Sequence, residues 1–130
     1  MTEAGEPMEY VEVFLEGQVE FSTVTEIDGS YFFDGLREAR DYVARPYYNE
    51  EPINGLSTFD ISELSRYLLG DDIGLTPYQF IAADANNNGA ITILDLLEIR
   101  EVLLGIEDNF DNNTSWRFVP ADYVFPEPTN

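Results

Sequence analysis

Residues 84–95 read Asp-Ala-Asn-Asn-Asn-Gly-Ala-Ile-Thr-Ile-Leu-Asp, and this stretch decides how the second half of the chain is expected to fold. Oxygen-bearing side chains stand at its positions 1, 3, 5, 9 and 12. A hard cation such as Ca²⁺ takes about six to eight oxygen ligands, and a twelve-residue loop with this spacing wraps them around one point. The predicted calcium ligands are Asp84, Asn86, Asn88, the backbone carbonyl oxygen of Ala90, Thr92 (directly or through water) and Asp95.

Gly89 strengthens this interpretation, because it stands at loop position 6. That position needs a sharp turn with a positive φ, which glycine adopts without steric cost. The alternative is a turn rich in asparagine and glycine that binds no metal. Agreement at six positions with fixed spacing favours the calcium site.

An internal repeat relates this loop to an earlier segment of the chain. Shifting residues 49–70 by 35 positions places them on 84–105, which aligns Asp60 with Asp95 and repeats Leu-Leu-Gly at the end of each copy. The first loop is less complete, since Ile53 at its position 5 has no side-chain oxygen. It is either a rigid turn without metal or a second, weaker calcium site. The predicted ligands of that second site are Asn49, Glu51, Asn54 and Asp60.

Charge and composition exclude several classes of function. The chain of 130 residues has 26 acidic and 6 basic residues and a net charge of −20. Such a field disfavours nucleic acid and anionic membranes, whose binding relies on clustered lysine and arginine. The chain contains no cysteine, histidine or lysine, which removes most nucleophiles and general bases. A pair of carboxylates of the glycosidase kind remains possible. Acidic residues are so abundant here that some pair always lies close together, so such a pair does not indicate catalysis, and we expect no enzymatic activity.

The sequence gives no sign of insertion into a membrane. It has no run of about 20 apolar residues, the length that a membrane-spanning helix needs. The first seven residues lack the basic and apolar regions of a signal peptide. The sequence is therefore expected to be a mature form, an excised domain or a cytoplasmic protein.

A first domain is expected at residues 1–47, because residues 9–47 have an alternation of apolar and polar residues that is typical of strands. Four short strands are expected, and the Asp28-Gly29 pair between the second and third is a strong hairpin signal. Regular spacing of short strands favours a small antiparallel β-sandwich. The expected strands cover residues 10–16, 21–26, 31–33 and 41–45.

The pattern becomes helical after residue 48. Ile61, Leu64, Tyr67 and Leu68 form one apolar face in a helix expected over residues 58–69. Thr76-Pro77 predicts the start of a second helix that runs to Ala83. A third helix follows the calcium loop, and its apolar face contains Leu96, Ile99, Val102 and Leu103. Gly70 and Gly105 are expected to end the first and third helices. Residues 107–130 read as an irregular aromatic and proline-rich tail, packed on the domain or on a partner.

Two twelve-residue loops, each followed by a helix ending in Leu-Leu-Gly, resemble a dockerin domain over residues 48–106. Asp95 at position 12 fits, because dockerins close the loop with aspartate. Residues 28–36, with Asp41-Tyr42-Val43 after them, are similar to the last strands of Cna-B or carboxypeptidase-regulatory-like β-sandwiches. Such sandwiches precede dockerin-like repeats in secreted surface proteins of Bacteroidetes. The fold class expected is therefore α+β, an Ig-like/Cna-B-like β-sandwich followed by a dockerin-like pair of loop–helix calcium repeats.

The resemblance implies a calcium-dependent, non-catalytic adhesive module that is extracellular or at the cell surface and docks on a cohesin-like partner. Positions 10 and 11, which contact cohesins in dockerins, are Thr58-Phe59 and Ile93-Leu94 here. The alternative is an extracellular filament subunit, completed by strand donation from another copy of itself. Residues 122–125 are a candidate donated strand, and the first-helix face at Phe59, Ser62 and Arg66 is a candidate contact surface. An intracellular calcium sensor is disfavoured, since sensors expose a methionine-rich groove.

Overall fold

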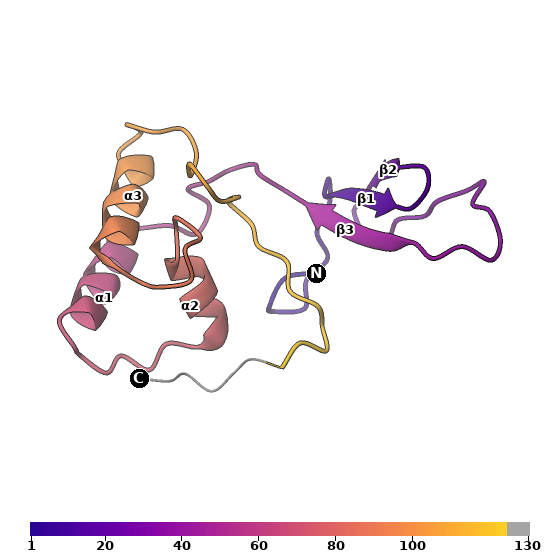
Figure 1. Cartoon of the computed structure of the whole chain (residues 1–130). Helices are drawn as coiled ribbons and strands as arrows, with labels where there is room; N and C mark the ends of the chain where they lie inside the picture. Colours follow the sequence, from indigo (N-terminus) through magenta and orange to yellow (C-terminus); the bar gives the residue numbers. More distant parts are fainter. Residues whose placement is uncertain (125–130) are drawn as a thin grey trace. The chain divides into compact units, whose positions relative to one another are not determined.

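The computed structural model describes residues 1–124 and divides the chain into two compact units (Figure 1). The first unit is Met1–Tyr48, and the second begins at Asn49. The first unit contains all the strands and the second contains all the helices of the described residues. The chain thus combines α and β structure in two separate parts.

The first unit contains an open sheet of three antiparallel strands. The strands are β1 (Glu12–Glu16), β2 (Phe21–Val24) and β3 (Val43–Tyr47), in the order β2-β1-β3. Val13 of β1 lies opposite Thr23 of β2 and Pro46 of β3. Because β3 is an edge strand, it tolerates a proline, which has no N–H to donate to a neighbouring strand.

One face of β1 supplies the small core of this unit. Val11, Val13 and Leu15 are buried, while the residues between them are exposed, as the alternating pattern predicts. Thr25 is buried beside them, and its hydroxyl accepts a hydrogen bond from Val11 N–H (2.9 Å) and donates one to the Met8 carbonyl (2.8 Å). The hydroxyl therefore adds to the backbone hydrogen bonds that already join this end, from Thr25 N–H to the Val11 carbonyl (2.9 Å) and from Tyr10 N–H to the Thr25 carbonyl (3.0 Å).

A β-sandwich was expected, but the described residues form one three-stranded sheet and no second sheet. The turn at Asp28-Gly29 does form, with Gly29 at φ 76° and Glu26 N–H bonded to the Ser30 carbonyl (2.9 Å). The expected strand at residues 31–33 is absent, and the rings of Tyr31 and Phe33 contact each other instead (6.1 Å between centroids). Residues 31–33 thus belong to a loop in which the rings of Tyr31 and Phe33 pack on each other.

The second unit contains α1 (Thr58–Leu68), α2 (Pro77–Ala83) and α3 (Ile93–Leu103). The predicted helices are confirmed to within a few residues. Each helix begins with a capping box, in which the first residue's hydroxyl and a side chain in the first turn satisfy free backbone N–H groups. Gly70 (φ 93°) and Gly105 (φ 67°) follow α1 and α3 in the left-handed conformation expected of helix-terminating glycines.

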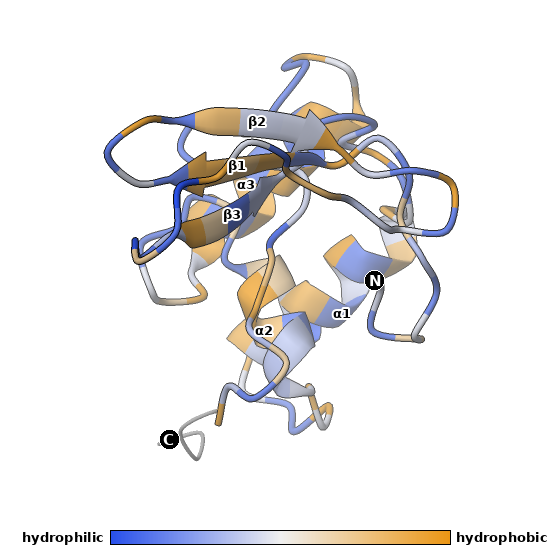
Figure 2. Ribbon diagram, turned by 90° about the vertical axis from the view of Figure 1, so that its right-hand side faces the viewer, coloured by the Kyte–Doolittle hydropathy of each residue, from blue (hydrophilic) through white to orange (hydrophobic). Residues whose placement is uncertain are grey.

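The core of the second unit lies where α1 and α3 contact each other (Figure 1). Leu64 of α1, Ile99 of α3 and Ala85 of the intervening loop are buried together. All three helices carry hydrophobic residues, with hydrophilic bands between them on α1 (Figure 2). The residues that complete the core are Leu56, Ile61, Tyr67, Leu68, Ala83, Ile91, Leu96 and Phe110.

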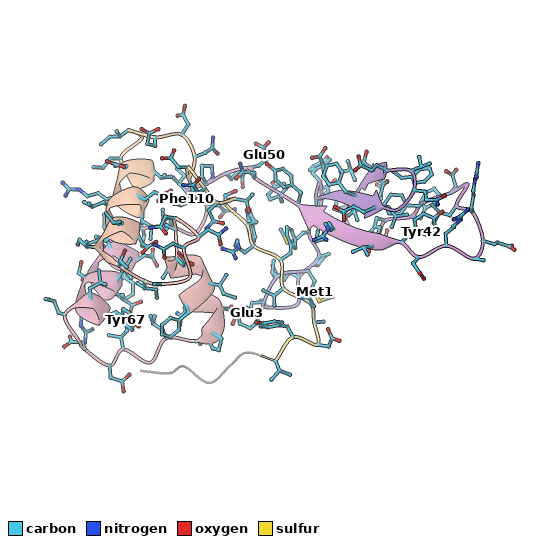
Figure 3. The ribbon with its side chains drawn as sticks, viewed as in Figure 1. Met1, Glu3, Tyr42, Glu50, Tyr67 and Phe110 are labelled. Atoms are coloured by element: carbon cyan, nitrogen blue, oxygen red, sulfur yellow. The ribbon has the colours of Figure 1, made fainter. Side chains whose placement is uncertain are left out.

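The chain after α3 is irregular, as expected. Residues 107–124 contain no helix or strand, but Phe110 packs on the helical core (Figure 3). Of the candidate donated strand, residues 122–124 are not in a strand, and Phe125 lies outside the described residues. None of the described helices has the length and apolar character needed to cross a membrane.

Candidate metal centre

The loop at residues 84–95 is held at both ends by helices. Asp84 is the C-terminal cap of α2, and its N–H donates to the Phe80 carbonyl. Asp95 lies in the first turn of α3, and Thr92 caps that helix. Ala85, the second loop residue, is buried in the core. The two predicted carboxylate ligands therefore start and end a loop that is anchored by packing.

Backbone N–H groups within the loop orient its side-chain oxygens. The Asp84 carboxylate accepts from Asn88 N–H (3.0 Å) and from Gly89 N–H (2.9 Å). Asn86 Oδ1 also accepts from Asn88 N–H (3.2 Å), and Asn88 Oδ1 accepts from Ala90 N–H (2.9 Å). The oxygens at positions 1, 3 and 5 are thus each fixed by a turn of the same loop, which is the behaviour of short polar side chains in tight turns.

Two residues in this loop adopt the left-handed conformation. Gly89 has φ 84°, as its position 6 requires. Asn87 has φ 57°, a value that asparagine tolerates better than most residues. These two positive φ values bend the chain so that the loop curls back over its own residues instead of extending.

Asp95 is fully buried, and all of its recorded partners are hydrogen-bond donors. Its Oδ1 accepts from Asn86 N–H (3.1 Å), across the loop. Its Oδ2 accepts from the N–H (2.7 Å) and the hydroxyl (3.1 Å) of Thr92. The carboxylate therefore links both sides of the loop while it caps α3.

The donor set fits a hard cation. It consists of two carboxylates, two amide side-chain oxygens, a hydroxyl and a backbone carbonyl, which are the ligands that Ca²⁺ prefers. Among residues 1–124, no three acidic, histidine or cysteine side chains gather as a metal cluster. A cation in this loop would accordingly depend on Asn86, Asn88 and Ala90 for half of its oxygens.

The hydroxyl of Thr92 has a structural role beside its predicted one. It accepts from Leu94 N–H (3.2 Å) as the cap of α3 and contacts the Asp95 carboxylate. As a calcium ligand it stays a prediction, as do the other five residues of the set.

The first loop places its predicted ligands differently. Glu51 and Asn54 come together through the Asn54 amide (3.0 Å). Asn49 Oδ1 instead accepts from Ser115 N–H (2.8 Å), and Asp60 accepts from Ser57 N–H (2.7 Å) in the capping box of α1. The recorded contacts therefore join two of the four residues of the second candidate site.

One residue that contacts the candidate loop, Asn113, was not among those predicted from the sequence. The Asn113 amide donates to the backbone carbonyl of Asp84 (3.1 Å), so the tail contacts the first position of the candidate calcium loop. The sequence carries a partial signal for this, because the polar run Asn112-Asn113-Thr114 closely follows the apolar Phe110. Nothing in a local pattern specifies which distant carbonyl such an amide reaches.

Comparison with known proteins finds a similarity in the helical part. Residues 56–114 match the family model of the dockerin type I domain. The matched segment covers α1, α2, the loop at 84–95, α3 and the start of the tail, somewhat less than half of the chain. It begins after Asn49, Glu51 and Asn54, and the sheet lies outside it. No curated protein and no solved structure matches the chain.

Proposed function

We propose that the chain is a non-catalytic, calcium-dependent protein-binding module of a secreted or cell-surface protein. Dockerin domains bind cohesin domains of other proteins and occur in secreted proteins. The observation that carries the proposal is that the dockerin match includes the whole loop at 84–95, whose side-chain oxygens are held by its own backbone. The partner proposed for this chain is a cohesin-like domain.

The proposed calcium ligands are the six predicted residues of the loop from Asp84 to Asp95. Only two of their side chains carry a formal charge, which supports modest affinity, about 10⁻⁴–10⁻³ M as in extracellular modules. A bound ion would offset the repulsion between Asp84 and Asp95 and join α2 to α3. The proposed role of calcium is to hold these helices in their binding arrangement.

The proposed docking surface lies at the start of α1 and α3. Phe59 is 66% exposed, and Ile93 and Leu94 are 57% and 59% exposed, although all three are apolar. We propose that they belong to one patch, because contiguous exposed apolar surface is typical of binding sites. Arg66, on the same helix as Phe59, forms a surface ion pair with Asp71 (3.0 Å). We therefore propose a partner surface that is mainly apolar where it meets these residues.

Calorimetry on two matched variants tests the calcium site. Asp95→Asn and Asp60→Asn each remove the carboxylate from a capping box with the same geometry, because Asp60 accepts from Ser57 N–H as Asp95 does from Thr92 N–H (2.7 Å in both). Calcium heat should disappear in Asp95→Asn and persist in Asp60→Asn. Unchanged heat in Asp95→Asn would contradict the site. Two ions in the wild type and one in Asp60→Asn would instead assign a second site to the first loop.

The docking surface is tested against cohesin domains on a sensor surface. Binding should require calcium and disappear with chelator. Leu94→Asp, in the first turn of α3, should weaken it, whereas Leu69→Asp, at the C-terminal cap of α1 and also exposed, should not. Undiminished binding in Leu94→Asp would place the contact elsewhere.

A second candidate function rests on the open sheet. In the described residues β2 and β3 are edge strands, and each leaves one row of backbone groups free to pair with another chain. A donated strand from a second copy would extend this sheet toward the Cna-B-like sandwich and would build a filament. Light scattering decides between the candidates, since a filament subunit grows in mass with concentration whereas a docking module needs its partner.

A further inference from the structure

The segment after α3, residues 110–115, contacts both loops of the second unit, and we call it the strap. Its first residue, Phe110, packs on the core formed by Leu64, Ala85 and Ile99. The next N–H, that of Asp111, donates to Glu98 Oε1 of α3 (3.0 Å). These contacts direct the rest of the strap across the unit.

The middle of the strap contacts the candidate calcium loop. Asn113 Nδ2 donates to the backbone carbonyl of Asp84 (3.1 Å), which is loop position 1. Asn87 Nδ2, at position 4, donates weakly to the Asn112 carbonyl (3.5 Å). The strap thus uses the backbone oxygen of Asp84 and leaves the carboxylate of that residue to the loop.

The end of the strap contacts the first loop. Ser115 N–H donates to Asn49 Oδ1 (2.8 Å), and the Ser115 hydroxyl donates to the Glu50 carbonyl (3.0 Å). Asn49 and Asp84 are 35 residues apart, so both stand at position 1 in the repeat. The strap therefore touches position 1 of both loops, through a side-chain oxygen in one and a backbone oxygen in the other. Glu50 is labelled on the segment that leads into the helices (Figure 3).

We propose that the strap couples calcium binding at residues 84–95 to the ordering of Asn49 and Glu50, with Asn113 and Ser115 as positioning residues. In the first loop Asn49 Oδ1 is directed to Ser115 N–H, and Ile53 at position 5 has no side-chain oxygen, so we expect one ion per chain, in the loop at 84–95. This inference rests on the proposed calcium site. Position 1 of the first loop is instead satisfied by the chain itself.

The physical basis is that one residue, Asp84, serves the ion and the strap. A cation that fixes the Asp84 side chain also restricts the backbone carbonyl to which Asn113 donates. Coupling of this kind is reciprocal, so whatever orders the strap must raise calcium affinity by the same factor. A single hydrogen bond of ordinary strength accounts for a change of about two- to tenfold in the dissociation constant.

The experiment compares Asn113→Ala with Asn112→Ala in the full chain. The Asn112 side chain is exposed and forms no hydrogen bond with any of residues 1–124, and both variants retain the backbone carbonyl that Asn87 reaches. Calcium titration should show one ion in all proteins and affinity weakened about two- to tenfold in Asn113→Ala alone. Deuterium exchange should show that calcium protects Ser115 and residues 48–51 in the wild type and in Asn112→Ala, but not in Asn113→Ala.

Asn49→Ala tests the other end of the strap and lies outside the helical core. It should weaken calcium binding by a similar factor, and the double variant with Asn113→Ala should be no weaker than either single variant, because both cut the same connection. Additive losses, or calcium-dependent exchange that persists in Asn113→Ala, overturn the coupling. Loss of an ion in Asn49→Ala overturns the assignment of that residue to the strap. If the titration of the wild type shows no calcium binding, the proposed function is refuted as well as the coupling.

Discussion

Asp28 lies in the turn after β2, and the hydrogen bonds of that turn shift the pKa of its carboxyl. Hydrogen bonds from Ser30, first from its side chain and then from its N–H (2.9 Å), lower the pKa of the Asp28 carboxyl below its ordinary value of 3.8. A lowered pKa in the folded state means that these bonds favour the turn above pH 3.8. That contribution is lost as the pH falls through the folded pKa.

We predict that NMR titration gives Asp28 a midpoint below 3.8 and that Ser30→Ala raises it toward that value. Ser22→Ala, an exposed serine of the same unit, is the control and should leave the midpoint unchanged. An Asp28 midpoint at its ordinary value in the wild type would show that the Ser30 bonds do not persist in solution.

Thr25 offers a second test at single-residue scale. Thr25→Val keeps the shape of the side chain but removes the hydroxyl that serves Val11 N–H and the Met8 carbonyl. Leaving a buried N–H without a partner costs about 1–3 kcal/mol. We predict a loss of that size in the denaturant unfolding of the sheet unit, with Thr25→Ser largely retaining stability. Equal losses in both variants would mean that the methyl packing matters and not the hydrogen bonds.

At the scale of helices and strands, the sequence predicted what is encoded locally. α1 and α3 were predicted because their apolar spacing and final glycines lie within a single segment, and the structure adds the capping boxes at their starts. The strand at 31–33 was wrong because a run of three aromatic residues does not specify a pairing partner, and β1 already has β2 and β3 on its two sides. The loop at 84–95 was predicted from spacing alone, whereas the contact from Asn113 depends on a tertiary arrangement that no local pattern encodes.

The helical unit should melt at a higher temperature with calcium. Because the ion binds only the folded loop, a hundredfold excess over the dissociation constant adds about 2.7 kcal/mol, or about ten to twenty degrees in Tm for a unit of this size. Far-ultraviolet circular dichroism at helical wavelengths measures this shift with calcium and with chelator. Magnesium at equal ionic strength is the control. The same melting temperature in chelator and in calcium would show that the metal has no structural role.

At the scale of the whole molecule, the net charge of −20 acts on any cation that approaches. The charges lie mostly on exposed side chains, where salt screens them, and the screening length falls from about 10 Å at 0.1 M salt to about 3 Å at 1 M. We predict that the calcium dissociation constant rises severalfold over this range of sodium chloride. Sucrose at matched osmolality should leave it unchanged, and a constant value in both series would assign the affinity to the loop ligands alone.

The paired caps of α1 and α3 bear on how such repeats change over time. Asp60 and Asp95 each accept from the N–H and hydroxyl of a cap residue three positions earlier, Ser57 or Thr92. An aspartate that caps a helix in this way still stabilises the helix when its loop has lost the other calcium ligands. Mutations that remove those ligands need not remove the aspartate at position 12. An aspartate at position 12 of a repeated loop therefore shows that a helix begins there, whether or not the loop binds calcium. The number of bound ions is better judged from the residues at positions 3 and 5, which are Asn86 and Asn88 in the second loop.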